Sequence, residues 1–128
     1  MRPLTWAFWW VLGGAVLFST TLFFCLRPST PSEPWIANLD KLQHAFAFFV
    51  LSFWSLALVE RRAYLRVTLV MVAVGAGIEV AQGLMPFGRS AEWADLMADL
   101  VGVVLALLAS LIVRESWFAR VETWLRRS

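Results

Sequence analysis

The amino-acid sequence predicts an all-α integral membrane protein, built as a four-helix transmembrane bundle with a C-terminal amphipathic helix at the membrane interface. Hydrophobic residues make up 60% of the 128-residue chain, and its mean hydropathy of +0.71 lies outside the range of soluble domains. Apolar stretches of the length that crosses a bilayer core recur along the chain. The arginines are distributed unevenly between the segments that connect these stretches. We interpret residues 1–128 as a single membrane domain.

The four predicted spans cover residues 4–26, 42–59, 67–85 and 95–113, and the interfacial helix covers residues 114–127. A signal peptide is an alternative for the first stretch, but its apolar run is longer than a usual h-region and no A-x-A cleavage site follows. Cys25 would suit lipoprotein processing if a small residue preceded it, whereas bulky Phe24 stands there. We therefore expect a retained first span, with Cys25 as an apolar packing residue near its end.

A proline-rich segment follows the first span. Residues 27–38, with the sequence RPSTPSEPWIAN, contain three prolines and show no periodicity, so we expect a loop on the outer face of the membrane. This loop is either a lid over that face or a simple connector.

The second predicted span opens with a polar cluster that contains the single histidine of the chain. Asp40 and His44 are four residues apart and Lys41 and His44 are three apart, so all three share one face at the outer end of a helix. They form either part of a polar site or a helix start capped by Asn38 or Asp40, with His44 satisfied by a neighbour.

The third predicted span carries a stripe of small and polar residues. Gly75, Glu79 and Gln82 recur at spacings of four and three, which places them on one helical face. Glu79 lies seven residues before Pro86, and therefore roughly 10 Å of helix rise below the expected helix end. A carboxylate at that depth must be protonated, paired with a base or reached by water.

A short turn leads from the third span into a fourth span that begins with acidic residues. Arg89 in this turn can hold a carboxylate of the neighbouring helices, or a phosphate, with two hydrogen bonds, and a purely structural ion pair is the alternative. Asp95 and Asp99 lie one turn apart, so one of them should hold a proton unless a cation lies between them. Their face continues from Gly102 onward with small residues, which indicates close packing on another helix.

The arginine distribution predicts the orientation of the chain. By the positive-inside rule, the N-terminus, the loop of residues 60–66 and the C-terminus are expected in the cytoplasm. The tail places its apolar residues on one helical face and its arginines elsewhere, which is typical of a basic amphipathic helix on the inner leaflet. The arginines on this side are Arg2, Arg61, Arg62, Arg66, Arg114, Arg120, Arg126 and Arg127.

Three motifs in a fixed order carry a family resemblance. The pattern D-K-x-x-H at residues 40–44, E-x-x-Q at residues 79–82 with Pro86 and Arg89, and D-x-x-x-D-x-x-G at residues 95–102 resembles the VanZ-like family over roughly residues 35–110. Asp99 stands where the family usually has Asn, and the extra negative charge could require an additional cation. The resemblance implies a multi-pass helical protein of the bacterial inner membrane, and the family's namesake is linked to low-level teicoplanin resistance.

The polar residues of these motifs gather at or just below the outer boundary, so we expect a ligand-binding site on the extracytoplasmic side. Independent packing would have scattered them over both leaflets. The candidate binding residues are Asp40, Lys41, His44, Glu79, Gln82, Arg89, Asp95 and Asp99.

Three functions fit such a site. The first is binding without catalysis, in which Arg89, Lys41 and His44 hold a phosphate or carboxylate of an envelope lipid, a lipid-linked cell-wall precursor or an amphiphilic glycopeptide. The second is metal-assisted hydrolysis or group transfer on a lipid-linked substrate. The third, proton or ion transport with Glu79 as a relay, is disfavoured because no polar path continues to the cytoplasm.

The candidates for catalysis in the second function are His44, Glu79, Asp95 and Asp99, and the candidate metal ligands are His44, Glu79 and Asp99. We expect membrane lipids as partners and no nucleic acid. We expect no cofactor, with a divalent cation as the one alternative.

Overall fold

The computed structural model describes residues 4–26, 34–85, 92–113 and 117–127, with the side chains of these ranges except those of residues 34–38. In these ranges the chain forms five α-helices, one short 3-10 turn and no strand. The elements in chain order are α1 (Ala7–Leu26), α2 (Pro34–Ala57), η1 (Arg61–Ala63), α3 (Tyr64–Leu84), α4 (Trp93–Ile112) and α5 (Trp117–Leu125).

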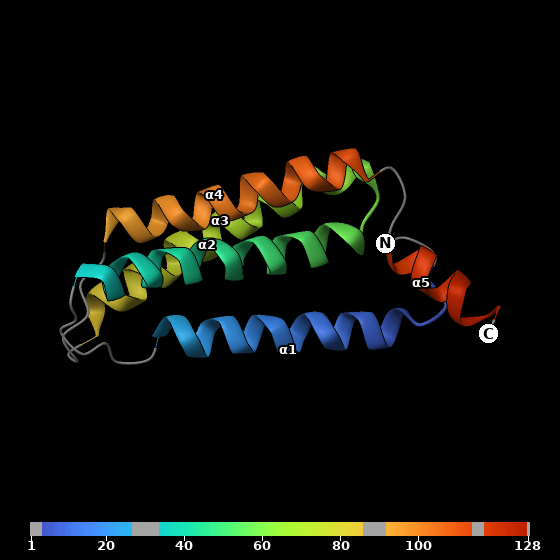
Figure 1. The fold of residues 1–128 in the computed structure, drawn as a ribbon, viewed down its shortest axis with the longest axis horizontal. Helices are drawn as coiled ribbons and strands as arrows, with labels where there is room; N and C mark the ends of the chain where they lie inside the picture. Colours follow the sequence, from blue (N-terminus) through green and yellow to red (C-terminus); the bar gives the residue numbers. More distant parts are fainter. Residues whose placement is uncertain (1–3, 27–33, 86–91, 114–116, 128) are drawn as a thin grey trace.

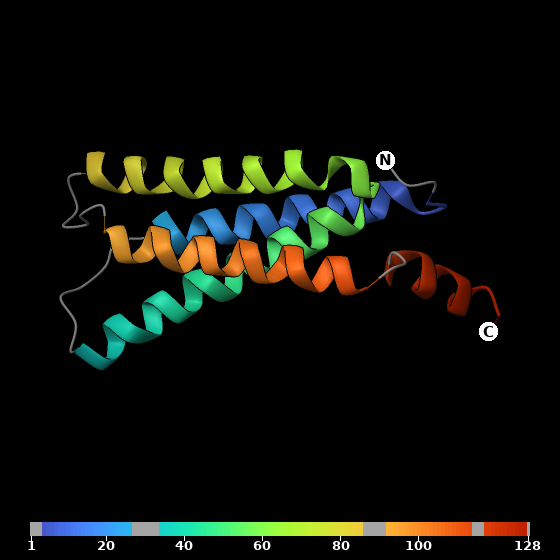
Figure 2. The same cartoon turned by 90° about the horizontal axis from the view of Figure 1, so that it is seen from above.

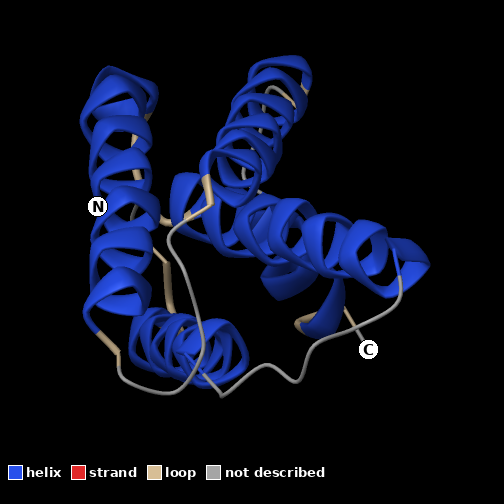
Figure 3. Cartoon of the chain, turned by 90° about the vertical axis from the view of Figure 1, so that its left-hand side faces the viewer, coloured by secondary structure: helices blue, strands red, loops and turns tan. Residues whose placement is uncertain are grey.

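The first four helices run along one common axis, and α5 lies at one end of the molecule beside the start of α1 (Figure 1). The pair α2 and α4 forms the most extensive helix contact, with α2 crossing obliquely when seen from above (Figure 2). Helix α1 contacts α2 and α3. The end-on view in Figure 3 shows that all the described elements are helices or short connections. We call the end where α1 and α3 finish and α2 and α4 begin the polar end.

The helix boundaries agree with the predicted spans within a few residues, except at the start of α2. We predicted a loop through residue 38, and this prediction is wrong because α2 already begins at Pro34. Proline suits the first turn of a helix, where its missing N–H would have no intrahelical partner. The alternative of a helix start capped by Asn38 or Asp40 is therefore also wrong, since both residues lie inside α2.

The distribution of polar and apolar side chains is that of a membrane protein. Large apolar side chains face outward, with Phe8 70% and Leu84 80% exposed, whereas Glu79 is only 6% and Asp99 only 2% exposed. Lipid solvates the outward apolar surface, while ionisable groups turn toward the bundle interior. In the described part of the chain, three helical stretches are long and apolar enough to cross a membrane, namely Ala7–Leu26, Arg61–Leu84 and Trp93–Ile112.

Helix α2 is long enough to be a further span, with 24 residues. Its first half carries Asp40, Lys41 and His44, which lowers the mean hydropathy of that half. The fourth transmembrane span therefore stays a prediction.

Close backbone contact between α2 and α4 depends on one small residue. A Cβ atom at Gly102 would overlap the backbone oxygen of Ala45 and would lie 2.9 Å from the amide nitrogen of Phe49. Below this contact, Ala106 is fully buried against Leu56 and Tyr64. The predicted close packing of the small-residue face of α4 is confirmed, and it fixes how α2 and α4 face each other.

Helix α5 docks on the end of the bundle opposite the polar end. Phe118 is fully buried and stacks on Trp10 of α1 at a centroid distance of 4.2 Å. Glu122 accepts hydrogen bonds from the backbone N–H groups of Thr5 and Trp6, both at 3.0 Å, and from the Trp10 indole at 2.8 Å. Its burial opposes ionisation, but these hydrogen bonds lower the pKa of Glu122 below its ordinary value. The carboxylate thus accepts hydrogen bonds from the backbone directly before α1 and joins it to α5.

Candidate functional site

The structure brings seven of the eight predicted site residues together at the polar end. Helix α2 contributes three of them, α3 two and α4 two, because the antiparallel helices place the start of α2, the end of α3 and the start of α4 at the same end of the molecule (Figure 1). The eighth, Arg89, lies outside the described residues. The seven are Asp40, Lys41, His44, Glu79, Gln82, Asp95 and Asp99.

The centre of this group is a buried pair between α2 and α4. Nδ1 of His44 lies 2.9 Å from Oδ1 of Asp99, and the two side chains are 3% and 2% exposed. A carboxylate on one ring nitrogen fixes the orientation and tautomer of an imidazole and leaves the other nitrogen available. The helical spacing predicted Asp40 and Lys41 as the neighbours of His44, but its direct partner comes from a different helix.

Glu79 connects α3 to the beginning of α4. Its Oε2 atom accepts a hydrogen bond of 2.9 Å from the backbone N–H of Glu92, the residue just before α4. A carboxylate in this position interacts favourably with the positive end of the α4 dipole. The sequence predicted a buried carboxyl group that is protonated, paired with a base or reached by water. In the structure one of its two oxygens accepts a hydrogen bond from the backbone.

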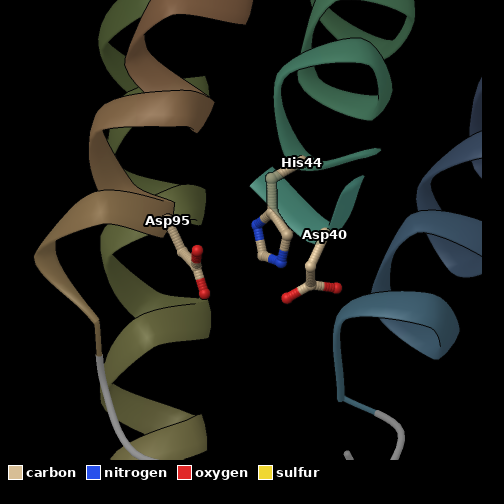
Figure 4. A group of neighbouring side chains, drawn as sticks. All are labelled: Asp40, His44 and Asp95. Carbon is tan, nitrogen blue, oxygen red and sulfur yellow. The ribbon is translucent and has the colours of Figure 1, made fainter. Parts of the chain in front are cut away.

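An outer ring of charges surrounds the central pair. The ammonium of Lys41 lies 3.4 Å from Oε2 of Glu92 and 3.7 Å from Oδ1 of Asp95. Figure 4 shows the imidazole of His44 between the carboxylates of Asp95 and Asp40. Lys41 is therefore partly neutralised by acidic neighbours, which weakens its ability to hold an anion.

Gln82 ties the polar end of α1 to α3. Its Nε2 atom donates a hydrogen bond of 2.8 Å to the backbone oxygen of Cys25, and the side chain is buried. The amide therefore holds two helices together, and its Oε1 atom has no hydrogen-bond partner among the described residues.

Several buried acceptor atoms of the site have no hydrogen-bond partner within the described part of the chain. They are Oε1 of Glu79, Oε1 of Gln82, Oδ1 of Asp95 and Oδ2 of Asp99. Buried acceptors without partners are costly, by about 1–3 kcal/mol each. The arrangement can thus bind a hydrogen-bond donor or a cation.

Among the described residues, two groups of three have the ligand types and spacing to hold a metal ion. They are Asp40, His44 and Asp95, and His44, Glu79 and Asp99, with one candidate atom from each residue lying within 4.8 Å of the others in its group. Both groups include His44, so they describe two alternative positions around the same ring.

The sequence analysis missed Glu92 as a member of the site. Its backbone N–H binds Glu79 and its carboxylate faces Lys41. Its position just before an apolar periodic stretch was a signal that it starts a helix. The contact with Glu79 required knowledge of how α3 and α4 meet.

A comparison with protein-family models covers the residues of this site. The VanZ/LLP1 model matches residues 15–114. The chain belongs to the VanZ/LLP1 family. The matched range contains α2, α3 and α4 with all the residues of the polar end, and it excludes α5. No curated protein and no solved structure matches the chain.

Membership of the VanZ/LLP1 family confirms the resemblance found in the three motifs. Together with the apolar helices, it identifies a membrane protein linked to the envelope or to resistance. At the polar end of this family member, four ionisable side chains are buried among apolar helices, namely those of His44, Glu79, Asp95 and Asp99.

Proposed function

We propose that this VanZ/LLP1 family member binds an amphiphilic envelope lipid, with the lipid headgroup at the polar end and a hydrocarbon chain in a groove between α1 and α2. In this proposal α2 is the fourth span of an inner-membrane bundle. Both termini lie in the cytoplasm and the polar end faces the extracytoplasmic boundary, as the arginine distribution favours.

The observation that carries the proposal is an apolar groove of about 380 Å³ next to the polar cluster. Its walls are mainly apolar side chains of α1 and α2, including Leu17, Phe24, Phe46, Ala47 and Val50. Ligand sites commonly combine an apolar wall with a few polar groups that fix orientation.

The groove lies near the polar end, because residues of both its walls come from the parts of α1 and α2 at that end. Gln43 lines the groove, and the next residue is His44 at the centre of the buried pair. Thr20 and Thr21 of α1 line the same groove, and α1 ends at this end of the molecule (Figure 1). A molecule with its chain in the groove would therefore bring its headgroup to the acidic side chains.

The surroundings of the groove support a lipid chain as its occupant. The exposed side chains beside it, such as Phe23 and Leu42, are those of a lipid-facing surface, where hydrocarbon chains are the abundant apolar partner. An acyl chain can fill such a groove without a polar penalty.

The charges of the polar end favour a particular headgroup chemistry. The described acidic residues outnumber Lys41 and the imidazole of His44, and several of their oxygens lack hydrogen-bond partners. Headgroups with hydroxyl or amino donors suit these oxygens better than a bare phosphate does. The proposal therefore departs from phosphate binding by Lys41 and His44, since both already face carboxylates.

Filling the groove should remove the lipid. An Ala47→Phe variant places a bulky ring among the groove walls, and we expect at least about a 10-fold loss of lipid retained on the protein, since 1.4 kcal/mol of lost contact is enough for a tenfold change. The measurement is native mass spectrometry of protein released from nanodiscs that contain phosphatidylethanolamine and phosphatidylglycerol.

The matched control is Ala73→Phe, which makes the same change at an exposed position of α3 outside the groove. It should retain lipid like the unmodified protein. Equal retention by both variants would contradict the proposal. Displacement of the lipid by added teicoplanin would identify the glycopeptide as a competing ligand of the same groove.

A further inference from the structure

We infer that His44, Glu79 and Asp99 form a binding site for one divalent transition-metal ion, with Zn²⁺ as the best fit, at the junction of α2, α3 and α4. The site lies at the polar end, where the proposed function also places the lipid headgroup, but its argument does not depend on lipid binding.

The three side chains converge from three different helices. One candidate ligand atom of each lies within 4.8 Å of those of the other two, and the closest pair, His44 Nδ1 and Asp99 Oδ1, is 2.9 Å apart. Zn²⁺ binds nitrogen and oxygen ligands at about 2.0–2.2 Å, which allows ligand atoms about 3 Å apart. An ion bound here would replace the proton between His44 and Asp99, and an oxygen of Glu79 would complete the set.

Two buried carboxylate oxygens without hydrogen-bond partners support the metal site independently of the ligand spacing. Oε1 of Glu79 and Oδ2 of Asp99 have no hydrogen-bond partner in the described structure, and these residues are 6% and 2% exposed. Native proteins leave few buried acceptors unsatisfied, so these two oxygens call for a partner such as a bound cation.

The neighbouring helix leaves room for this arrangement. A Cβ atom at Gly75 would lie 3.1 Å from Oδ2 of Asp99, so that this oxygen points at the face of α3 that carries Gly75. Glu79 lies one helical turn further along the same face. The free oxygen of Asp99 is therefore directed toward the helix that presents Glu79.

The balance of charge favours a divalent ion. Two ionised carboxylates and a neutral imidazole carry two negative charges in an apolar bundle, where uncompensated charge is costly. One divalent cation neutralises them. A set of one imidazole and two carboxylates suits Zn²⁺ better than Mg²⁺, because imidazole is a preferred ligand of zinc and oxygen-only sets are typical of magnesium.

The alternative position between Asp40, His44 and Asp95 is less favourable (Figure 4). The ammonium of Lys41 lies 3.7 Å from Oδ1 of Asp95, so a cation bound there would face a positive charge at short range. No described cationic side chain other than the imidazole itself contacts Glu79 or Asp99.

The test is metal binding by the full chain in detergent after treatment with a chelator. We expect one Zn²⁺ per chain by elemental analysis, and a Co²⁺-loaded sample with visible absorption bands of a nitrogen and oxygen ligand set. Glu79→Gln keeps the size of the side chain but removes a proposed ligand. Loss of a residue that only supports a ligand weakens metal binding about 10- to 100-fold, and we expect Glu79→Gln to weaken Zn²⁺ binding by more than this.

Two control variants decide the position of the ion. Glu60→Gln removes a carboxylate from the loop at the opposite end of the molecule and should bind Zn²⁺ normally. Asp95→Asn should retain binding if the ion lies between His44, Glu79 and Asp99. Loss of binding in Asp95→Asn with retention in Glu79→Gln would overturn the inference in favour of the outer position, and absence of stoichiometric Zn²⁺ in the unmodified protein would overturn it outright.

Discussion

A Gly102→Ala variant is expected to lose at least about 2–3 kcal/mol of unfolding free energy, because added atoms in a packed interface force the backbone to move. The new Cβ would overlap the backbone oxygen of Ala45, which is not a flexible side chain that can turn away. The measurement is reversible unfolding of the purified protein in mixed detergent micelles, followed by loss of helical circular dichroism.

The matched control is Gly77→Ala in α3. A Cβ at Gly77 would meet no atom within 4 Å, so this variant should be unchanged or more stable by about 0.5–1 kcal/mol, the usual gain for alanine over glycine in a helix. Equal effects of the two substitutions would mean that the α2–α4 contact is not as close as described.

A His44→Leu variant is expected to lose about 3–5 kcal/mol, because it leaves the carboxylate of Asp99 buried without its partner. The double variant His44→Leu with Asp99→Leu should recover most of this loss, since apolar pairs often replace buried ion pairs at little cost. The measurement is the same unfolding experiment in the presence of a chelator, so that bound metal does not contribute.

The double variant also separates stability from function. It should fold and yet bind neither Zn²⁺ nor the lipid headgroup with the affinity of the unmodified protein. Additive effects of the two single substitutions would contradict the direct coupling of His44 and Asp99, since residues in contact are expected to be non-additive.

The location of the site could be predicted from the sequence, because it depends on regular features. Apolar periodicity marked the helices, and alternation of direction placed Asp40, Glu79 and Asp95 at one end. Helical spacing of three and four residues then gave the faces that these residues share. These arguments need only the spans and their order.

The pairing within the site could not be predicted in the same way. The partner of His44 is Asp99, 55 residues later, and this contact depends on the crossing and rotation of α2 against α4. Gly102 allows the backbones of α2 and α4 to come close together. In the sequence, however, a small residue predicts close packing without showing which helix packs there or which residues face each other. The bond from the Glu92 backbone to Glu79 depends on the same kind of tertiary detail.

The start of α2 was mispredicted for a local reason. Three prolines in residues 27–38 were taken to exclude helix throughout this segment, whereas the last of them, Pro34, occupies the first position of α2. Proline breaks a helix in its interior but suits its first turn. The lid proposed for residues 27–38 concerns positions that largely lie outside the described residues.

The central claim is that a lipid chain occupies the groove between α1 and α2 with its headgroup at the polar end. It is tested most directly by photo-crosslinking in nanodiscs with a phosphatidylethanolamine that carries a diazirine on its acyl chain, followed by mapping of the labelled peptides. We predict that labelling concentrates on residues 17–24 and 43–51 and falls in Ala47→Phe. Labelling spread evenly over outward-facing positions such as Leu65 and Ile112, unchanged in that variant, would contradict the claim.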